Sequence, residues 1–250
     1  MKYIHFLYQG ETSWGVVEGD DVWICDGSIS EGFTKTGEKR RKEDISLLTP
    51  GTPSKILCVG LNYLDHIHEF DKEIPDSPVI FMKPETTLLP PFGTIIHPPI
   101  SERMDFEGEL AVVIGKTAKD ISEDEAKDYI FGYTCANDVT ARDLQPMDGQ
   151  WILAKGFDTF LPLGPWIETE LDTSNLSIRT LLNGEVKQLS NTSYLLFKPE
   201  MLVSYLSSYM TLYPGDVILT GTSSGVGPMK SGDTVVVEIE GIGSLENTVR

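Results

Sequence analysis

No apolar run in this 250-residue sequence approaches the roughly 20 residues that a membrane-spanning helix needs. The N-terminus, Met1–Leu7, lacks the long apolar region and cleavage site of a signal peptide. Basic residues are scarce, because 20 Lys and Arg stand against 38 Asp and Glu, a formal net charge of −18. This charge disfavours nucleic acid and anionic membranes as partners. We therefore expect a cytoplasmic protein whose partner is a small molecule.

Cysteine is also scarce, with Cys25, Cys58 and Cys135 widely spaced and no Cys-x-x-Cys pair. An odd number of isolated cysteines in apolar surroundings argues against a disulfide framework, a zinc site and thiol redox chemistry. Nucleotide-binding loops are missing too. The Gly-rich stretch 221–227 lacks the Gly-Lys-Ser/Thr of a phosphate-binding loop and the glycine spacing of a dinucleotide fingerprint.

The chain divides into two parts. Residues 1–26 have the pattern of short strands separated by turns, and residues 27–54 lose that pattern. The basic cluster at 34–42 predicts a solvated loop more readily than a binding patch. A Pro- and Gly-containing linker at 49–53 then places a boundary near residue 53, with a small N-terminal domain at 1–53 and the main domain at 54–250.

Three local signals in the main domain predict its secondary structure. Asn183-Gly184 between extended arms indicates a hairpin. Ser122 and Glu125 have the spacing of a capping box, which predicts a short exposed helix. The stretch 198–206 has a proline near its start and apolar residues at helical spacing, so we expect the longest helix there.

The first candidate site lies in the stretch 105–115. If this stretch is one extended strand, Glu107 and Glu109 project from the same face, and the apolar run at 110–114 argues that the face is buried. Two adjacent carboxylates repel each other unless a cation lies between them or water surrounds them. A hard cation that prefers oxygen ligands, Mg²⁺ first, is the natural candidate.

Further polar residues follow downstream. Asp138 ends an apolar strand candidate at 129–137, where it can supply a third metal oxygen or cap the next segment. Arg142 and Gln145 are spaced to point the same way from one helical turn. Lys155 lies in an apolar stretch, and a buried lysine needs a partner such as a carboxylate. Arg142 and Lys155 supply the local positive charge that an acidic substrate needs in a chain of negative charge, and Gln145 adds a neutral polar group beside them.

A possible acid–base pair lies nearer the N-terminus. If the stretch 60–70 is helical, His66 and Glu69 are close enough for a hydrogen bond. A carboxylate on one imidazole nitrogen raises the basicity of the other, as a general base requires. Spacing alone favours a surface helix in which the two residues have no role. A separate Gly-rich loop at 221–227 carries Gly221 and Thr222, and such loops can hold a carboxylate.

The order of five motifs resembles the fumarylacetoacetate hydrolase family, and the resemblance runs from about residue 54 to the C-terminus. The motifs are GLNYxxHxxE at 60–69, MDFEGE at 104–109, NDVTARDLQ at 137–145, KGFDTFLPLGP at 155–165 and TGTSSGVG at 220–227. Ser223 departs from this pattern, since many members carry proline there. The resemblance implies a β-rich α+β fold, a mixed β-roll with a small N-terminal domain, in a homodimer.

The resemblance also assigns roles to the candidate residues. It implies that Glu107, Glu109 and Asp138 hold Mg²⁺ or Mn²⁺, and that His66 and Glu69 form an acid–base dyad on a lid over the substrate. The remaining residues would line the pocket and hold carboxylate or carbonyl oxygens: Lys155, Arg142, Gln145, Gly221 and Thr222.

These roles support three related reactions of a 2-oxo acid. We hypothesise that the metal and Lys155 stabilise an enolate formed when the C3–C4 bond of the substrate breaks. Hydrolysis of an acylpyruvate-type acid ranks slightly ahead of decarboxylation of an oxaloacetate-type acid, and isomerisation or tautomerisation of a 2-oxo diacid ranks third. A non-catalytic protein that binds metal or carboxylate is the alternative from another class.

Overall fold

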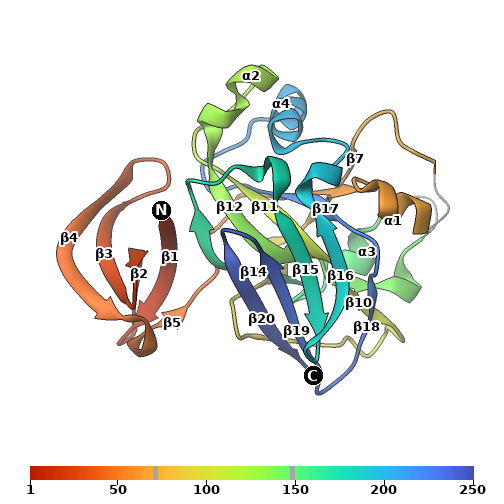
Figure 1. The fold of residues 1–250 in the computed structure, drawn as a ribbon, viewed down its shortest axis with the longest axis horizontal. Helices are drawn as coiled ribbons and strands as arrows, with labels where there is room; N and C mark the ends of the chain where they lie inside the picture. The colour runs from red at the N-terminus through yellow and green to blue at the C-terminus, as the bar shows by residue number, and fades with distance from the viewer. Residues whose placement is uncertain (70–72, 147–149) are drawn as a thin grey trace.

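The computed structural model describes residues 1–69, 73–146 and 150–250, and strands dominate it (Figure 1). The predicted β-rich fold is confirmed. Among the described residues, no helix is long and apolar enough to cross a membrane. All three cysteines are buried and unpaired with one another, as their spacing predicted.

The largest sheet has twelve strands. Its order is β4-β3-β2-β1-β14-β12-β11-β17-β6-β7, with β5 paired to β1 and β8 paired to β14. The bounds are β1 (Lys2–Tyr8), β2 (Glu11–Glu18), β3 (Asp21–Ser28), β4 (Gly32–Arg41), β5 (Ser46–Leu47), β6 (Ile56–Gly60), β7 (Val79–Lys83), β8 (Leu88–Leu89), β11 (Gly108–Ile114), β12 (Ile130–Asn137), β14 (Leu161–Glu168) and β17 (Val217–Thr222). The first strands join this sheet through the β1–β14 pairing, and the domain boundary near residue 53 stays a prediction.

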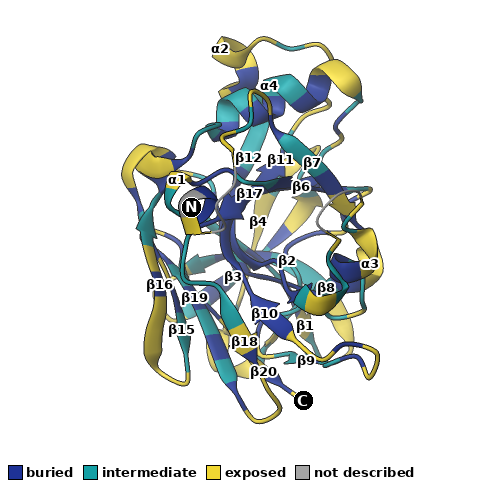
Figure 2. Cartoon of the chain, turned by 90° about the vertical axis from the view of Figure 1, so that its right-hand side faces the viewer, coloured by how far each residue is buried: buried dark blue, intermediate teal, exposed yellow. Residues whose placement is uncertain are grey.

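Two smaller sheets pack beside it. One contains β13 (Thr140–Ala141), β10 (Met104–Phe106) and β18 (Gly227–Met229). The other contains β16 (Glu185–Asn191), β15 (Ser177–Leu182), β19 (Thr234–Ile239), β20 (Gly243–Val249) and β9 (Thr94–Ile95). The main core lies between this sheet and β11–β12, where Leu110 and Val112 pack in one cluster with Ile178 and Val237. Figure 2 shows β11 and β17 buried at the centre of the molecule, so side chains at their ends are shielded from solvent.

The helices are short and follow the local signals. They are α1 (Leu64–Glu69), α2 (Glu123–Ala126), α3 (Ile152–Lys155), α4 (Pro199–Tyr209) and the 3-10 helices at Lys42–Asp44, Glu85–Thr87, Lys127–Tyr129, Arg142–Leu144, Thr173–Asn175 and Thr192–Tyr194. Both sides of the Ser122–Glu125 capping box form. The predicted long helix is α4, and the Asn183-Gly184 pair connects β15 to β16 with positive φ at both residues. These three predictions are confirmed.

The predicted loop at 34–42 is wrong, because residues 34–41 lie in strand β4, which pairs with β3. Its lysines form cross-strand ion pairs, Lys35 with Glu18 at 2.5 Å and Lys39 with Asp21 at 2.7 Å. Both ammonium groups also lie over the Trp23 ring. Opposite charges and cation–π contacts stabilise this exposed edge strand, and hydrophobic periodicity does not reveal either contact.

Candidate active site

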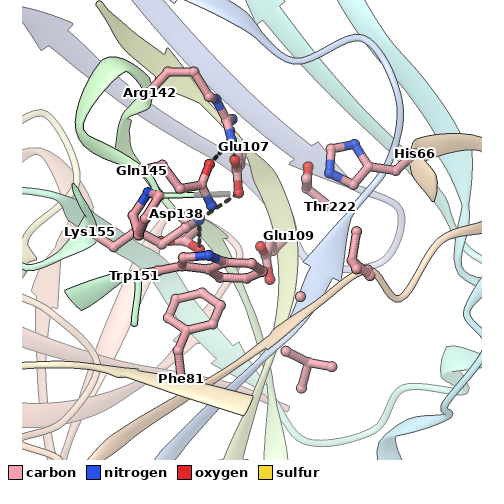
Figure 3. A pocket seen from close by; sticks show the side chains of 14 residues that line it. His66, Phe81, Glu107, Glu109, Asp138, Arg142, Gln145, Trp151, Lys155 and Thr222 are labelled. Carbon is pink, nitrogen blue, oxygen red and sulfur yellow. Dashed lines mark hydrogen bonds and ion pairs between the residues drawn. The ribbon is translucent and has the colours of Figure 1, made fainter. Parts of the chain in front are cut away.

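Three carboxylates meet where the chain passes between sheets (Figure 3). Glu107 lies between β10 and β11, Glu109 lies in β11, and Asp138 follows β12. One oxygen from each lies within 4.8 Å of the others, and all three residues are buried. The prediction of one continuous strand through Glu107 is wrong, because β10 and β11 belong to different sheets. The carboxylates nevertheless converge, and the Asp138 N–H donates to the Glu107 carbonyl at 2.8 Å.

The environments of Glu107 and Glu109 differ. Burial opposes ionisation of Glu107, but the Lys155 ammonium and the Arg142 guanidinium hold its pKa well below the usual range. Burial, with the charges of Asp138 and Glu107, instead raises the pKa of Glu109 well above its usual value. Its carboxylate accepts from the Gly221 N–H at 2.6 Å, and it forms no ion pair within the described ranges 1–69, 73–146 and 150–250. A cation bound at the triad would supply the positive partner that the Glu109 carboxylate lacks.

Two buried lysines hold Asp138. Lys155 in α3 donates to Asp138 at 2.5 Å and to Glu107 at 2.9 Å, and although burial opposes its charge, the pKa of Lys155 is raised by these carboxylates. Lys83 at the end of β7 donates to Asp138 and to the Val139 carbonyl, and burial lowers its pKa. Sequence reasoning missed Lys83. Strand alternation was the available signal, since Lys83 faces the same way as the buried Phe81.

Arg142 lies among three acceptors. It donates to Asp105 at 2.9 Å, to the Gln145 side chain at 2.6 Å, and to Glu107. Arg142 and Gln145 thus point the same way from one 3-10 turn, as their spacing predicted. Asp105 is fully buried and also pairs with Arg103 at 2.8 Å, a role that the sequence did not indicate. The guanidinium therefore holds one oxygen of the Glu107 carboxylate, while Lys155 holds the other.

The His66–Glu69 pair forms on α1. The His66 Nδ1 lies 3.4 Å from a Glu69 carboxylate oxygen, and His66 is 8% exposed. Burial lowers the pKa of His66, although Glu107 and Glu69 oppose that effect. The Glu69 carboxylate also accepts from the Gly225 N–H at 3.1 Å, which ties α1 to the Gly-rich loop. Burial therefore favours the neutral imidazole at the edge of the cavity, which is the form that can accept a proton.

Gly221 and Thr222 end strand β17 beside the triad. The Gly221 N–H is directed at Glu109 rather than at the cavity. Thr222 does line the cavity, and its hydroxyl donates to the Gly108 carbonyl at 3.0 Å and accepts from Gln188 at 2.7 Å. The Thr222 hydroxyl proton is thus directed at the protein backbone and not at a ligand oxygen. The resemblance implied instead that Thr222 holds a carboxylate or carbonyl oxygen of the ligand.

The triad opens into a cavity of about 300 Å³, a volume suited to a small metabolite. Figure 3 places Arg142 and Gln145 on one side of the carboxylates, His66 and Thr222 on another, and Trp151 and Phe81 on a third. The lining residues are Val59, Gly60, Leu61, His66, Phe81, Glu107, Glu109, Asp138, Arg142, Gln145, Pro146, Trp151, Lys155 and Thr222. The cavity therefore joins a polar wall to an apolar one.

A buried oxygen-donor triad beside a His–Glu pair defines a candidate divalent-metal site with a proton-transfer group. Residues 55–250 match the family described as Fumarylacetoacetate (FAA) hydrolase C-terminal, and residues 1–50 match the Rv2993c-like N-terminal family. The chain belongs to the fumarylacetoacetate hydrolase family, and the resemblance seen in its motifs is confirmed.

Three relatives illustrate the chemistry of the family. The chain is 45% identical over 220 residues to the mitochondrial oxaloacetate tautomerase Fahd2a of Rattus norvegicus, covering 83% of this chain and 70% of that one. The structure of 5-carboxymethyl-2-hydroxymuconate delta-isomerase from Mycobacterium smegmatis is 44% identical with a TM-score of 0.94, covering 100% of this chain and 99% of that one. Fumarylpyruvate hydrolase from Pseudomonas aeruginosa, solved with Mn²⁺ and pyruvate, is 30% identical with a TM-score of 0.75, covering 82% of this chain and 98% of that one. These relatives are enzymes of different reaction types.

Proposed function

We propose that this protein is a divalent-metal-dependent enzyme that moves a proton beside the keto group of a 2-oxo diacid, as a tautomerase or isomerase. The observation that carries the proposal is a buried His66 that lines the same cavity as the carboxylate triad. The relatives named as a tautomerase and an isomerase, at 45% and 44% identity, support this choice.

The ion is part of the proposal. Glu107, Glu109 and Asp138 would hold Mg²⁺ or Mn²⁺, since both prefer oxygen ligands and Glu109 is a buried carboxyl without an ion-pair partner among the described residues. When bound, such an ion acts as a Lewis acid that polarises a keto oxygen and so acidifies the adjacent C–H. We keep Mg²⁺ and Mn²⁺ as equal candidates, and a homodimer as the expected assembly.

The side chains of the site divide the remaining work. His66, whose neutral form is favoured by burial, accepts the proton from the carbon next to the keto group and returns it to the product. Glu69 orients the imidazole through its Nδ1. Lys155 and Arg142 fix the Glu107 carboxylate, while Trp151 and Phe81 form the wall that limits access of water.

The donors in the cavity favour proton transfer over hydrolysis. Hydrolysis of an acylpyruvate needs free donors for a second oxyanion as well as a positioned water. Among the described lining residues, the charged donors Lys155 and Arg142 donate to buried carboxylates and Thr222 donates to a backbone carbonyl, so the neutral N–H groups of Gln145 and Trp151 are the donors left for an oxyanion. We therefore rank hydrolysis second here, ahead of decarboxylation, whereas the sequence had ranked it first. Hydrolysis stays a candidate because the His66–Glu69 pair can also activate a water molecule.

A substrate panel tests the proposal. The purified protein, with Mg²⁺ or Mn²⁺ and after EDTA treatment, is given oxaloacetate and acetylpyruvate. Loss of the enol absorbance of oxaloacetate is followed beside enzymatic detection of released pyruvate. We expect metal-dependent enol–keto conversion without pyruvate. Pyruvate from acetylpyruvate would establish a hydrolase and pyruvate from oxaloacetate a decarboxylase, and either result in the absence of enol–keto conversion would reject the proposal.

A further inference from the structure

Gln188 connects two parts of the candidate site from outside the cavity. It lies in β16, is 1% exposed, and does not appear among the lining residues. Its side-chain oxygen accepts from the Gly108 N–H at 2.9 Å. Its side-chain nitrogen donates to the Thr222 hydroxyl at 2.7 Å and to the Ser223 carbonyl at 2.9 Å. One carboxamide therefore bridges Gly108 of β11, the last residue of β17, Thr222, and the residue after that strand, Ser223.

The bridged residues belong to the two halves of the site. Gly108 separates the carboxylates Glu107 and Glu109, and Thr222 lines the cavity. Strands β11 and β17 pair at Glu109 and Thr222, but their register shifts before Ala111. The backbone ladder is thus irregular beside the triad. The Gln188 carboxamide supplies hydrogen bonds at that irregular point.

The hydrogen-bond directions around Gln188 are fixed by backbone groups. The Gly108 N–H can only donate and the Ser223 carbonyl can only accept, so the carboxamide has one possible orientation. The Gln188 nitrogen must then donate to the Thr222 hydroxyl, whose own proton goes to the Gly108 carbonyl. The Thr222 oxygen consequently offers the cavity a lone pair and no proton.

The packing leaves little room for another arrangement. A Cβ on Gly108 would lie 2.0 Å from the Thr180 hydroxyl and 3.3 Å from the Gln188 side-chain oxygen. A Cβ on Gly225 would lie 2.2 Å from the Lys187 carbonyl. The β15–β16 hairpin is therefore a close-fitting platform beneath both segments.

We propose that Gln188 is a positioning residue with two effects. It sets the spacing between the segment 107–109, which carries the candidate metal ligands, and the Gly-rich loop at 221–227, and it makes Thr222 a hydrogen-bond acceptor toward the ligand. Within the proposed function on which this inference rests, Thr222 would face a ligand group that carries a proton, such as an enol hydroxyl, or, with a keto acid such as pyruvate, a water molecule that bridges the Thr222 oxygen to the ligand. Gln188 itself touches no reacting atom.

Binding measurements on four variants test this role. Gln188→Met removes the carboxamide, Thr222→Val removes the hydroxyl, and the double variant completes a cycle. Asn247→Leu is the matched control, since Asn247 is equally buried and donates to the Pro90 and Gly93 carbonyls at 3.0 Å, away from the cavity. Calorimetry measures Mn²⁺ alone and then pyruvate added to the Mn²⁺-loaded protein.

We expect Gln188→Met to weaken Mn²⁺ binding about tenfold, as loss of a group that orients a metal ligand does, and to weaken pyruvate binding about tenfold. In a protein that already carries Thr222→Val, adding Gln188→Met should weaken pyruvate binding no further. Asn247→Leu should lower the melting temperature and leave both affinities unchanged. If the Gln188→Met variant does not fold, Gln188→Glu replaces it in the measurement of pyruvate binding. The carboxylate introduced by Gln188→Glu would keep an acceptor for the Gly108 N–H but would have no donor for Thr222.

Two results would overturn the inference. One is a Gln188→Met protein that loses thermal stability like Asn247→Leu but keeps both affinities. The other is a fully additive double variant, which would mean that Gln188 does not act through Thr222. The Mn²⁺ and pyruvate binding measurements require no turnover. They therefore test the role of Gln188 even if the protein shows no tautomerase activity. Steady-state assays with oxaloacetate then test whether the substitution raises KM more than it lowers kcat.

Discussion

The buried Lys83–Asp138 pair predicts a stability that depends on metal. Lys83 is 2% exposed and its ammonium donates to Asp138 and to the Val139 carbonyl. The substitution Lys83→Met keeps the length and apolar stem of the side chain and removes the charge. Asp138 then keeps Lys155 as its cationic partner, at 2.5 Å.

The size of the effect follows from these contacts. Removing one partner of a buried ion pair costs about 3–5 kcal/mol, and the remaining bond from Lys155 places this case near 3 kcal/mol. A divalent ion at the triad neutralises Asp138 again. The loss should then fall to about 1 kcal/mol, the value of the missing hydrogen bond to the Val139 carbonyl. By linkage, the difference of about 2 kcal/mol corresponds to Mn²⁺ binding about 30-fold tighter in the variant.

Urea unfolding followed by tryptophan fluorescence measures both numbers, in EDTA and in saturating Mn²⁺. Lys55→Met is the matched control, because Lys55 forms an ion pair with the fully buried Asp216 away from the cavity. The control should lose the same free energy of unfolding in both conditions. An equal loss for Lys83→Met with and without Mn²⁺ would refute the assignment of the triad as a metal site.

Two substitutions within the site separate binding from proton transfer. Glu109→Gln should weaken Mn²⁺ binding in calorimetry by at least about tenfold, yet keep or raise the melting temperature in EDTA, because a buried carboxyl with a raised pKa becomes a neutral amide. An unchanged Mn²⁺ affinity would remove Glu109 from the ligand set. His66→Ala should lower turnover about 10²–10⁴-fold while Mn²⁺ affinity stays within about twofold, a bound set by the scatter of independent sites. A normal turnover rate would exclude His66 from the mechanism.

Local sequence signals predicted local structure well. The capping box at Ser122, the Asn183-Gly184 turn and helix α4 each depend on residues within a few positions of one another. The predictions that failed depend on distant partners. Strand β4 forms because its lysines meet acids 17 and 18 residues away, and the break at Glu107 arises because β10 and β11 join different sheets.

The same distinction applies to the candidate site. The sequence indicated the carboxylates and Lys155 because charged residues are unusual in or beside apolar stretches. It missed Lys83 and Gln188, which meet their partners across 55 and 80 residues of chain. Only the order of strands in the sheets brings β7 and β16 to the triad. Strand alternation could have marked Lys83 as facing inward, but it could not have identified Asp138 as the partner.

The structure also changes the argument about how a chain of net charge −18 could bind an acid. The sequence suggested that the cations at the site reverse the repulsive field. In the structure they are paired, since four cations, Lys83, Arg103, Arg142 and Lys155, contact the carboxylates of the cluster. Four carboxylates, Asp105, Glu107, Glu109 and Asp138, balance them when all are ionised. A divalent ion would therefore bring the cluster to a charge of +2, which matches the two negative charges of a 2-oxo diacid, so the metal rather than the lysines would determine whether this site attracts its substrate.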